Sequence, residues 1–363
     1  MNSGRALQLT PLWPLATVLG TTPTTVRKPL KEMSPPVQRR ILGIRWFLTA
    51  VLLPVVLVAV VYGYGEYHRR RDYRPYFIQR HGCLTTIYEA VVEEGAGHQT
   101  VRIRLENDGG LVVDGYVKAP SGHSGPTAGN TRYPAFLLLG GVRTGKNTLD
   151  YIHNTKNIVM LALDYPYPGK KSGLSPGEFI RAIRPIRRAV IDTPPAAMLG
   201  VDYLLGREDV DPERIILVGG SVGAVFVPAV AATDTRIAAA VMLFGAADIE
   251  TLLSANINAT RWIAGPASWL GAVLTSPVEP AKYVADITPR PVFMLNGTGD
   301  PRMPEYCSRL LHETAKEPKS IRWIDAGHVD IRSKEFHSLV SRELAAWLIG
   351  QDLISRENFV EID

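Results

Sequence analysis

Residues 214–227, RIILVGGSVGAVFV, decide the fold of this chain. An apolar run, Arg214–Val218, leads through the G-x-S-x-G pattern of Gly219–Gly223 into small apolar residues. This order predicts a buried strand, a tight turn and a helix. Such a turn holds its serine in a strained conformation, so close neighbours must lack a Cβ and the hydroxyl of Ser221 projects beyond the strand. The amide of Val222 opens the helix, where it can stabilise a negative charge.

Further apolar strands, separated by helical segments, lie on both sides of this stretch. Continuous apolar strands are typical of a parallel sheet buried on both faces. The expected strands of this kind are Pro134–Leu139, Ile158–Leu163, Arg214–Val218, Ala238–Phe244, Pro291–Leu295 and Ser320–Ile324. Before them, short Gly-containing turns predict antiparallel hairpins from Thr85–Glu93, Val101–Glu106 and Leu111–Lys118. We expect one α/β domain over residues 83–350, with a mostly parallel central sheet covered by helices on both faces, and a C-terminal tail over 351–363.

Polar residues at two other strand ends complete a candidate site. Asp300 comes in the loop after Pro291–Leu295, and His328 follows the last expected strand. Chemistry in parallel sheets gathers at the carboxyl ends of the strands. The order serine, aspartate, histidine is one in which a nucleophile, an orienting acid and a general base are found. We predict Ser221, Asp300 and His328 as catalytic residues, with Asp248 as the alternative acid.

In these residues the chain resembles the α/β-hydrolase superfamily, in its esterase, dienelactone-hydrolase and prolyl-oligopeptidase-like group. The resemblance covers roughly residues 100–350. It rests on the turn Gly219–Gly223, the lead-in Leu204–Arg214, the loop Gly297–Asp300 and the pair Gly327-His328. It implies acyl transfer to water through a serine acyl-enzyme, with a small ester or thioester as substrate. A peptidase or amidase on the same fold, and a non-enzymatic membrane protein on a hydrolase scaffold, are the alternatives.

The loop after the third strand departs from the family's usual pattern. Members often carry His-Gly there, whereas residues 139–143 read LGGVR. The glycines still allow close approach of the backbone. The resemblance therefore implies that the amide of Gly141 or of Val142 joins that of Val222 in an oxyanion hole.

The same loop also fits a phosphate-binding pattern. Residues 140–146 read GGVRTGK, but Asn147 stands where a magnesium-binding Ser or Thr is required. Cys83 and Cys307 fit no metal-binding spacing, and the histidines form no ligand cluster. We expect no nucleotide site, no metal and no cofactor.

Residues 249–285 interrupt the alternation of strands and helices. Apolar residues recur there at helical spacing and include Trp262 and Trp269. Insertions at this place in the family often form a lid, which implies that these tryptophans contact a hydrophobic acyl or alcohol group of the substrate. The alternative is that the insertion merely packs against the body.

An uncharged run of 20 residues, Trp46–Gly65, lies near the N-terminus. As a helix it would span roughly 30 Å, the thickness of a bilayer core. We predict a single-pass transmembrane helix over residues 41–65, a flexible basic tail over 1–40 and a juxtamembrane linker over 66–82. Six basic residues before the helix against five after it favour neither orientation of the catalytic domain.

The distribution of charge argues against a nucleic-acid binder. Residues 1–80 carry 12 Lys and Arg against 3 Asp and Glu, whereas the rest of the chain carries 28 against 32. The net positive charge of the chain therefore belongs to the N-terminal segment, and the body has no predicted basic groove. The expected partners are a hydrophobic small-molecule ester and a membrane.

Overall fold

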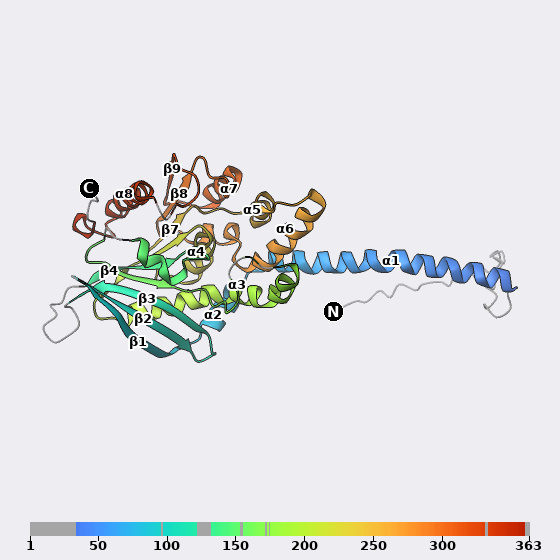
Figure 1. The fold of residues 1–363 in the computed structure, drawn as a ribbon, viewed down its shortest axis with the longest axis horizontal. Helices are drawn as coiled ribbons and strands as arrows, with labels where there is room; N and C mark the ends of the chain where they lie inside the picture. The colour runs from blue at the N-terminus through green and yellow to red at the C-terminus, as the bar shows by residue number, and fades with distance from the viewer. Residues whose placement is uncertain are drawn as a thin grey trace, which may run out of the picture. The chain divides into compact units, whose positions relative to one another are not determined.

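The computed structural model describes residues 34–95, 97–121, 132–152, 155–170, 173, 175–330 and 333–359. Residues 1–33 of the predicted N-terminal tail and 360–363 of the predicted C-terminal tail lie outside this part of the chain. The chain divides into two compact units, Met1–Val61 and Tyr62–Asp363. Figure 1 labels the elements and colours the chain from blue to red.

The described part of the first unit is almost entirely one helix, α1 (Pro35–Arg70), which continues into the second unit. Its stretch Gln38–Arg70 is long and apolar enough to cross a membrane, judged by length and composition alone. Pro54 lies within the helix without ending it. None of the apolar window is buried, which distinguishes this helix from the core helix of a globular domain.

Residues 66–82, predicted as a linker, belong to the second unit and pack against its other elements. The carboxylate of Glu66, in the last turns of α1, accepts a hydrogen bond from Nε1 of Trp269 at 3.3 Å. The short helix α2 (Arg74–His81) buries Phe77 completely. Because this segment is rich in charged residues, its sequence does not indicate that a few of its aromatic side chains pack against the rest of the unit.

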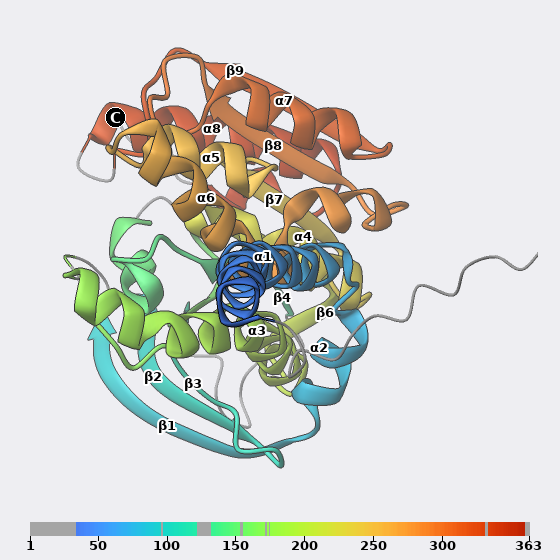
Figure 2. The same ribbon diagram turned by 90° about the vertical axis from the view of Figure 1, so that its right-hand side faces the viewer.

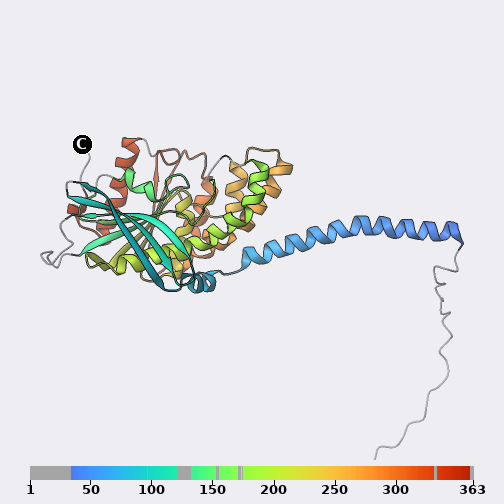
Figure 3. The same cartoon turned by 60° about the horizontal axis from the view of Figure 1, so that its bottom comes forward.

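One sheet runs through the second unit. Within the described residues its strands are β1 (Leu84–Gly95), β2 (His98–Asn107), β3 (Val112–Pro120), β4 (Tyr133–Leu139), β5 (Val159–Leu163), β6 (Val210–Gly220), β7 (Ala239–Leu243), β8 (Val292–Gly297) and β9 (Lys319–Ile324). They follow the order β1-β2-β3-β5-β4-β6-β7-β8-β9. The pairs β1–β2, β2–β3 and β3–β5 are antiparallel. The pairs β4–β5, β4–β6, β6–β7, β7–β8 and β8–β9 are parallel. Figure 2 shows β1 and β9 at opposite ends of the body, and Figure 3 shows the long antiparallel strands at one edge.

Helices cover both faces of this sheet, as the sequence predicts. The α-helices of the second unit after α2 are α3 (Pro176–Leu205), α4 (Val222–Thr233), α5 (Ile249–Asn256), α6 (Arg261–Thr275), α7 (Glu305–Thr314) and α8 (Lys334–Gly350). The 3₁₀ helices in the part of the chain that the structure describes are η2 (Gly145–Tyr151), η3 (Ser276–Val278), η4 (Pro280–Lys282), η5 (Val284–Asp286) and η6 (Arg356–Asn358).

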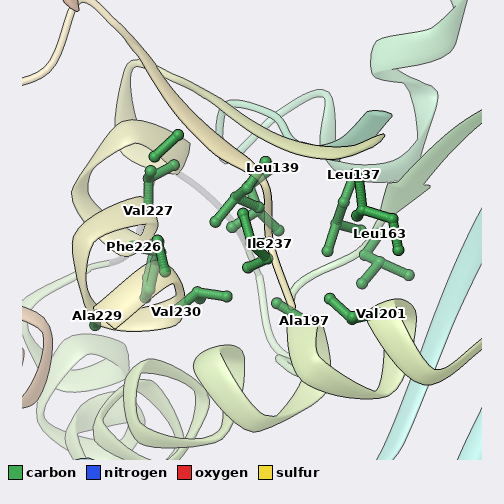
Figure 4. Close-up of a cluster of buried hydrophobic side chains, with 14 of the residues drawn as sticks. Leu137, Leu139, Leu163, Ala197, Val201, Phe226, Val227, Ala229, Val230 and Ile237 are labelled. Carbon is green, nitrogen blue, oxygen red and sulfur yellow. The ribbon is translucent and has the colours of Figure 1, made fainter. Parts of the chain in front are cut away.

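Alternate side chains of the central strands enter two separate cores. Leu137 and Leu139 of β4 join α3 and α4 in one core, where they lie near Val201 and Val227 (Figure 4). Phe136 and Leu138 of the same strand face the other way, toward α8. The period of two along a strand therefore explains why β4 is apolar at every position.

The predicted C-terminal tail is ordered over residues 351–359. Leu353 and Ile354 are buried in the core beneath α8. The side-chain amide of Asn358 donates to the carbonyls of Lys156 and Asn157 at 3.1 and 3.0 Å. This segment therefore forms part of the domain, because its few apolar residues and one amide fix it there.

Candidate active site

Ser221 occupies a sharp turn between β6 and α4. Its φ of 53° lies in the left-handed region, which is unusual for a residue with a side chain. A Cβ on Gly223 would lie 1.8 Å from the carbonyl oxygen of Leu139, and one on Gly219 would lie 2.5 Å from Val227. Only glycine fits at both places. The strand, turn and helix predicted from the sequence are present here.

The side chains of Ser221, His328 and Asp300 lie in one hydrogen-bonded chain. The Ser221 hydroxyl is 2.9 Å from Nε2 of His328, and Nδ1 of His328 is 2.7 Å from Oδ2 of Asp300. The His328 side chain is 14% exposed and that of Asp300 is 2% exposed. A serine hydroxyl, an imidazole and a buried carboxylate in this sequence of contacts can activate the hydroxyl as a nucleophile.

The environment of Asp300 keeps its carboxylate charged. Burial by itself would raise the pKa of Asp300, but the hydrogen bond from His328 and those from two backbone amides outweigh it, so the pKa is lowered. The amides of Arg302 and Met303 donate to Oδ1 at 2.8 and 3.1 Å. The carboxylate is thus held in place on one oxygen and presents the other to the imidazole.

Asp248, the alternative acid, is engaged elsewhere. It caps α5, where its carboxylate accepts hydrogen bonds from the amide and hydroxyl of Thr251 at 3.2 and 2.6 Å. The Glu279 carboxylate fixes the backbone at this cap by accepting from the Asp248 amide at 2.9 Å. The contacts of Asp248 are those of a helix-capping residue.

A buried polar network supports the loop that carries Asp300. The Asn296 side-chain amide, at the end of β8, donates to the Gly245 carbonyl and to Ser308 Oγ, both at 3.0 Å. His312 Nε2 lies 3.0 Å from Asn296 Oδ1. Burial, with smaller contributions from neighbouring cations, lowers the pKa of His312 to about 4, so its imidazole is neutral near pH 7. Sequence analysis missed this network, because nothing in the spacing of Asn296, Ser308 and His312 marks them as partners.

The loop after β4 forms a second wall beside Ser221. Gly141 and Val142 line the same cavity as Ser221 and Val222. Val222 is the first residue of α4, where an amide has no carbonyl partner within the helix. The Tyr165 hydroxyl donates to the Gly140 carbonyl and fixes the start of the loop. Backbone amides from two loops therefore border the space next to the serine.

The lysine of the phosphate-binding pattern in this loop contacts other side chains of the domain. Lys146 forms an ion pair with Asp164 at 3.1 Å and lies 5.4 Å from the ring centroid of Tyr116. The segment that follows is the 3₁₀ helix η2, not the α-helix whose N-terminus would hold a phosphate. Among the described residues, no group of three or more His, Cys, Asp or Glu side chains is placed to hold a metal ion.

A cavity of about 450 Å³ opens beside Ser221 and His328. Most of its wall is apolar and comes from strand ends and from α8. Among its residues are Phe136, Leu138, Val218, Phe336, Val340 and Leu344. Sequence analysis missed the contribution of α8, because the spacing of its apolar residues does not reveal where the helix packs.

The sequence predicts that two tryptophans within residues 249–285 contact the substrate, but the structure places both away from the cavity. Neither Trp262 nor Trp269 lines the cavity. Trp269 stacks on Tyr62 with ring centroids 5.6 Å apart, and Trp262 is 91% exposed at the start of α6. Of these two tryptophans, Trp269 packs on the end of α1, and neither reaches the cavity.

Comparison with known proteins agrees with this architecture. Residues 193–351 match the model of the prolyl oligopeptidase family. The uncharacterized protein YfhR of Salmonella typhimurium is 28% identical over 190 residues, which cover 51% of this chain and 59% of that protein. YfhR of Escherichia coli K12 is 26% identical over 189 residues, covering 52% and 59%. The match thus spans little more than half the length of these relatives.

Solved structures show the same fold at low sequence identity. An acetyl xylan esterase from Paenibacillus has a TM-score of 0.56 at 16% identity, covering 77% of this chain and 95% of that one. Acetyl xylan esterase 1 from Thermoanaerobacterium has the same TM-score and identity, covering 78% and 94%.

The fold and these matches define the class of protein: the chain has the α/β-hydrolase fold, and the predicted fold and the predicted resemblance to this superfamily are confirmed. The family match over residues 193–351 supports a serine hydrolase of this fold.

Proposed function

We propose that this chain is a membrane-anchored serine hydrolase that cleaves a carboxylic ester or thioester. The observation that carries the proposal is the hydrogen-bonded chain of Ser221, His328 and Asp300 at the edge of an apolar cavity. Labelling of the wild-type chain by a fluorophosphonate probe, and loss of that labelling in Ser221→Ala, tests the proposal.

The proposed reaction proceeds through an acyl-enzyme. His328 takes the proton of Ser221 as its oxygen attacks the carbonyl carbon, and Asp300 orients the imidazole and stabilises its cation. The amide of Val222, with that of Gly141 or Val142, would stabilise the oxyanion, each contributing about 10²–10³ in rate. His328 then protonates the leaving alcohol or thiol. Water, activated by the same imidazole, releases the acid and restores the serine.

The cavity favours an apolar acyl group. Val340 projects into its wall from α8, whereas Ala346 is exposed on the same helix. We expect Val340→Trp to lower kcat/KM for octanoyl esters about tenfold or more while sparing acetyl esters, because the indole would occupy the space that a longer chain needs. Ala346→Trp is the matched control. A chain-length series of p-nitrophenyl esters measures the effect, and an equal loss for both chain lengths would place the acyl group elsewhere.

A serine peptidase or amidase is the second candidate, since residues 193–351 match the prolyl oligopeptidase family. An anilide with the same acyl group as the best ester separates the two. Faster hydrolysis of the anilide than of the ester would favour the peptidase.

Membrane anchoring is proposed from α1. Its apolar stretch has the length of a bilayer core, and none of its apolar window is buried. We expect the full chain to remain in the membrane pellet after alkaline carbonate extraction. Val55→Arg with Val58→Arg should move it to the soluble fraction, since each arginine costs about 2.5–3.5 kcal/mol at a helix centre. Val55→Leu with Val58→Leu is the control, and a soluble wild-type chain would contradict the anchor.

A further inference from the structure

Two arginines, Arg143 and Arg302, lie at the cavity beside Ser221 and have no carboxylate partner among the described residues. Arg143 and Arg302 both line the cavity and both are exposed. Within the described part of the chain, neither guanidinium takes part in an ion pair or a hydrogen bond. Other arginines of the same unit are paired: Arg104 with Asp114, Arg207 with Asp209 and Arg236 with Asp234.

The fold places these arginines on two sides of the serine. Arg143 follows β4 and Arg302 follows β8, while Ser221 follows β6, which lies between those strands in the sheet. The carboxyl ends of parallel strands lie along one edge, so the two loops flank the nucleophile.

The backbone under each arginine is fixed. The Arg302 amide donates to Asp300 at 2.8 Å, and its carbonyl accepts from Asn256 at 2.8 Å. In the other loop, the carbonyl of Gly141 accepts from the amide of Gly145 at 3.0 Å. The backbone near each arginine is therefore held in place, while the side chain that carries the guanidinium group is exposed.

The rest of the cavity wall does not offset these charges. No Asp or Glu is among the described residues that line the cavity, and most of the wall is apolar. Two guanidinium groups at an apolar cavity attract an anion and can bind phosphate or carboxylate oxygens through several hydrogen bonds at once. A cationic ligand would meet repulsion and would find no carboxylate partner in the wall.

We propose that the substrates are esters that join an apolar acyl chain to an alcohol bearing a phosphate or carboxylate group. This inference rests on the proposed function. The acyl chain occupies the cavity against α8, and Arg143 and Arg302 bind the anionic group. Water is added across the ester: the bond between the acyl carbon and the alcohol oxygen breaks, the acid keeps the water oxygen, and the anionic alcohol leaves with a proton from His328.

A matched pair of esters tests this directly. The full chain, in detergent micelles, is given 1-octanoylglycerol 3-phosphate or 1-octanoylglycerol, which differ only in the phosphate. We expect wild type to prefer the phosphate ester by about tenfold or more in kcat/KM, since a charge-assisted contact contributes on that order. Octanoyl lactate and its methyl ester form the carboxylate arm and decide which anion is preferred.

Substitutions of the two arginines test whether they cause the preference for the phosphate ester. Arg143→Gln with Arg302→Gln should bring the ratio of phosphate to neutral ester close to one, mainly by raising KM for the phosphate ester. Arg143→Glu with Arg302→Glu should make the phosphate ester the poorer substrate. Arg261→Gln, on exposed α6, is the control and should keep the wild-type ratio.

The outcomes separate this inference from the proposed function. Equal kcat/KM for both wild-type esters of each pair, or equal losses on neutral and anionic esters in the glutamine variant, would overturn anion recognition. So would labelling of Ser221 by a fluorophosphonate without hydrolysis of either ester. Absence of that labelling would instead remove the nucleophile and the proposed function with it. The rate of labelling also reports whether each variant is folded.

Discussion

Replacing Ser221 with alanine is expected to abolish labelling by a fluorophosphonate probe and to lower ester turnover by roughly four orders of magnitude or more. The oxygen that bonds to phosphorus, or to the acyl carbon, is the one that lies 2.9 Å from His328. The turn that projects this side chain toward His328 depends on the glycines at 219 and 223.

The control for this substitution is Ser254→Ala, a change at an exposed serine on α5. It should leave labelling and turnover unchanged. Equal labelling of wild type and Ser221→Ala would refute this nucleophile, and a wild-type chain that never reacts would favour a non-enzymatic protein on a hydrolase scaffold.

The second large effect is expected from Asp300→Asn, which should lower kcat about 10³–10⁴-fold. A neutral amide can neither stabilise the imidazolium nor hold His328 in the tautomer that accepts the serine proton. The lowered pKa of Asp300 means that the wild-type carboxylate is ionised throughout the neutral range.

Asp248→Asn is the matched comparison, because this residue also follows a strand but caps α5. We expect it to cost stability and to leave kcat within a few-fold of wild type. Steady-state kinetics on a fast ester, together with thermal denaturation of both variants, separates the two effects. A larger kcat loss for Asp248→Asn would move the acid to the earlier strand.

The central sheet could be predicted because its strands are apolar without interruption. Each of the six expected parallel-type segments overlaps a strand, from β4 to β9. The candidate triad could be predicted because Ser221, Asp300 and His328 each follow such a strand. Parallel strands end at one edge, so residues far apart in sequence meet there.

Other parts of the molecule left no such signal. Phe77 of α2 and Leu353 near the C-terminus lie in short, mostly polar stretches, yet both are buried. The cavity wall from α8 depends on where a helix packs, which spacing alone does not reveal. Trp269 illustrates the converse, since this residue of an apolar stripe at helical spacing contacts another helix and does not line the cavity.

The left-handed backbone at Ser221 has a consequence for laboratory evolution. Glycine adopts this conformation without steric cost, so Ser221→Gly would relieve roughly 1–3 kcal/mol of strain. Selection for heat resistance alone would therefore enrich an inert protein. Any campaign to make this chain more robust has to score turnover at every round.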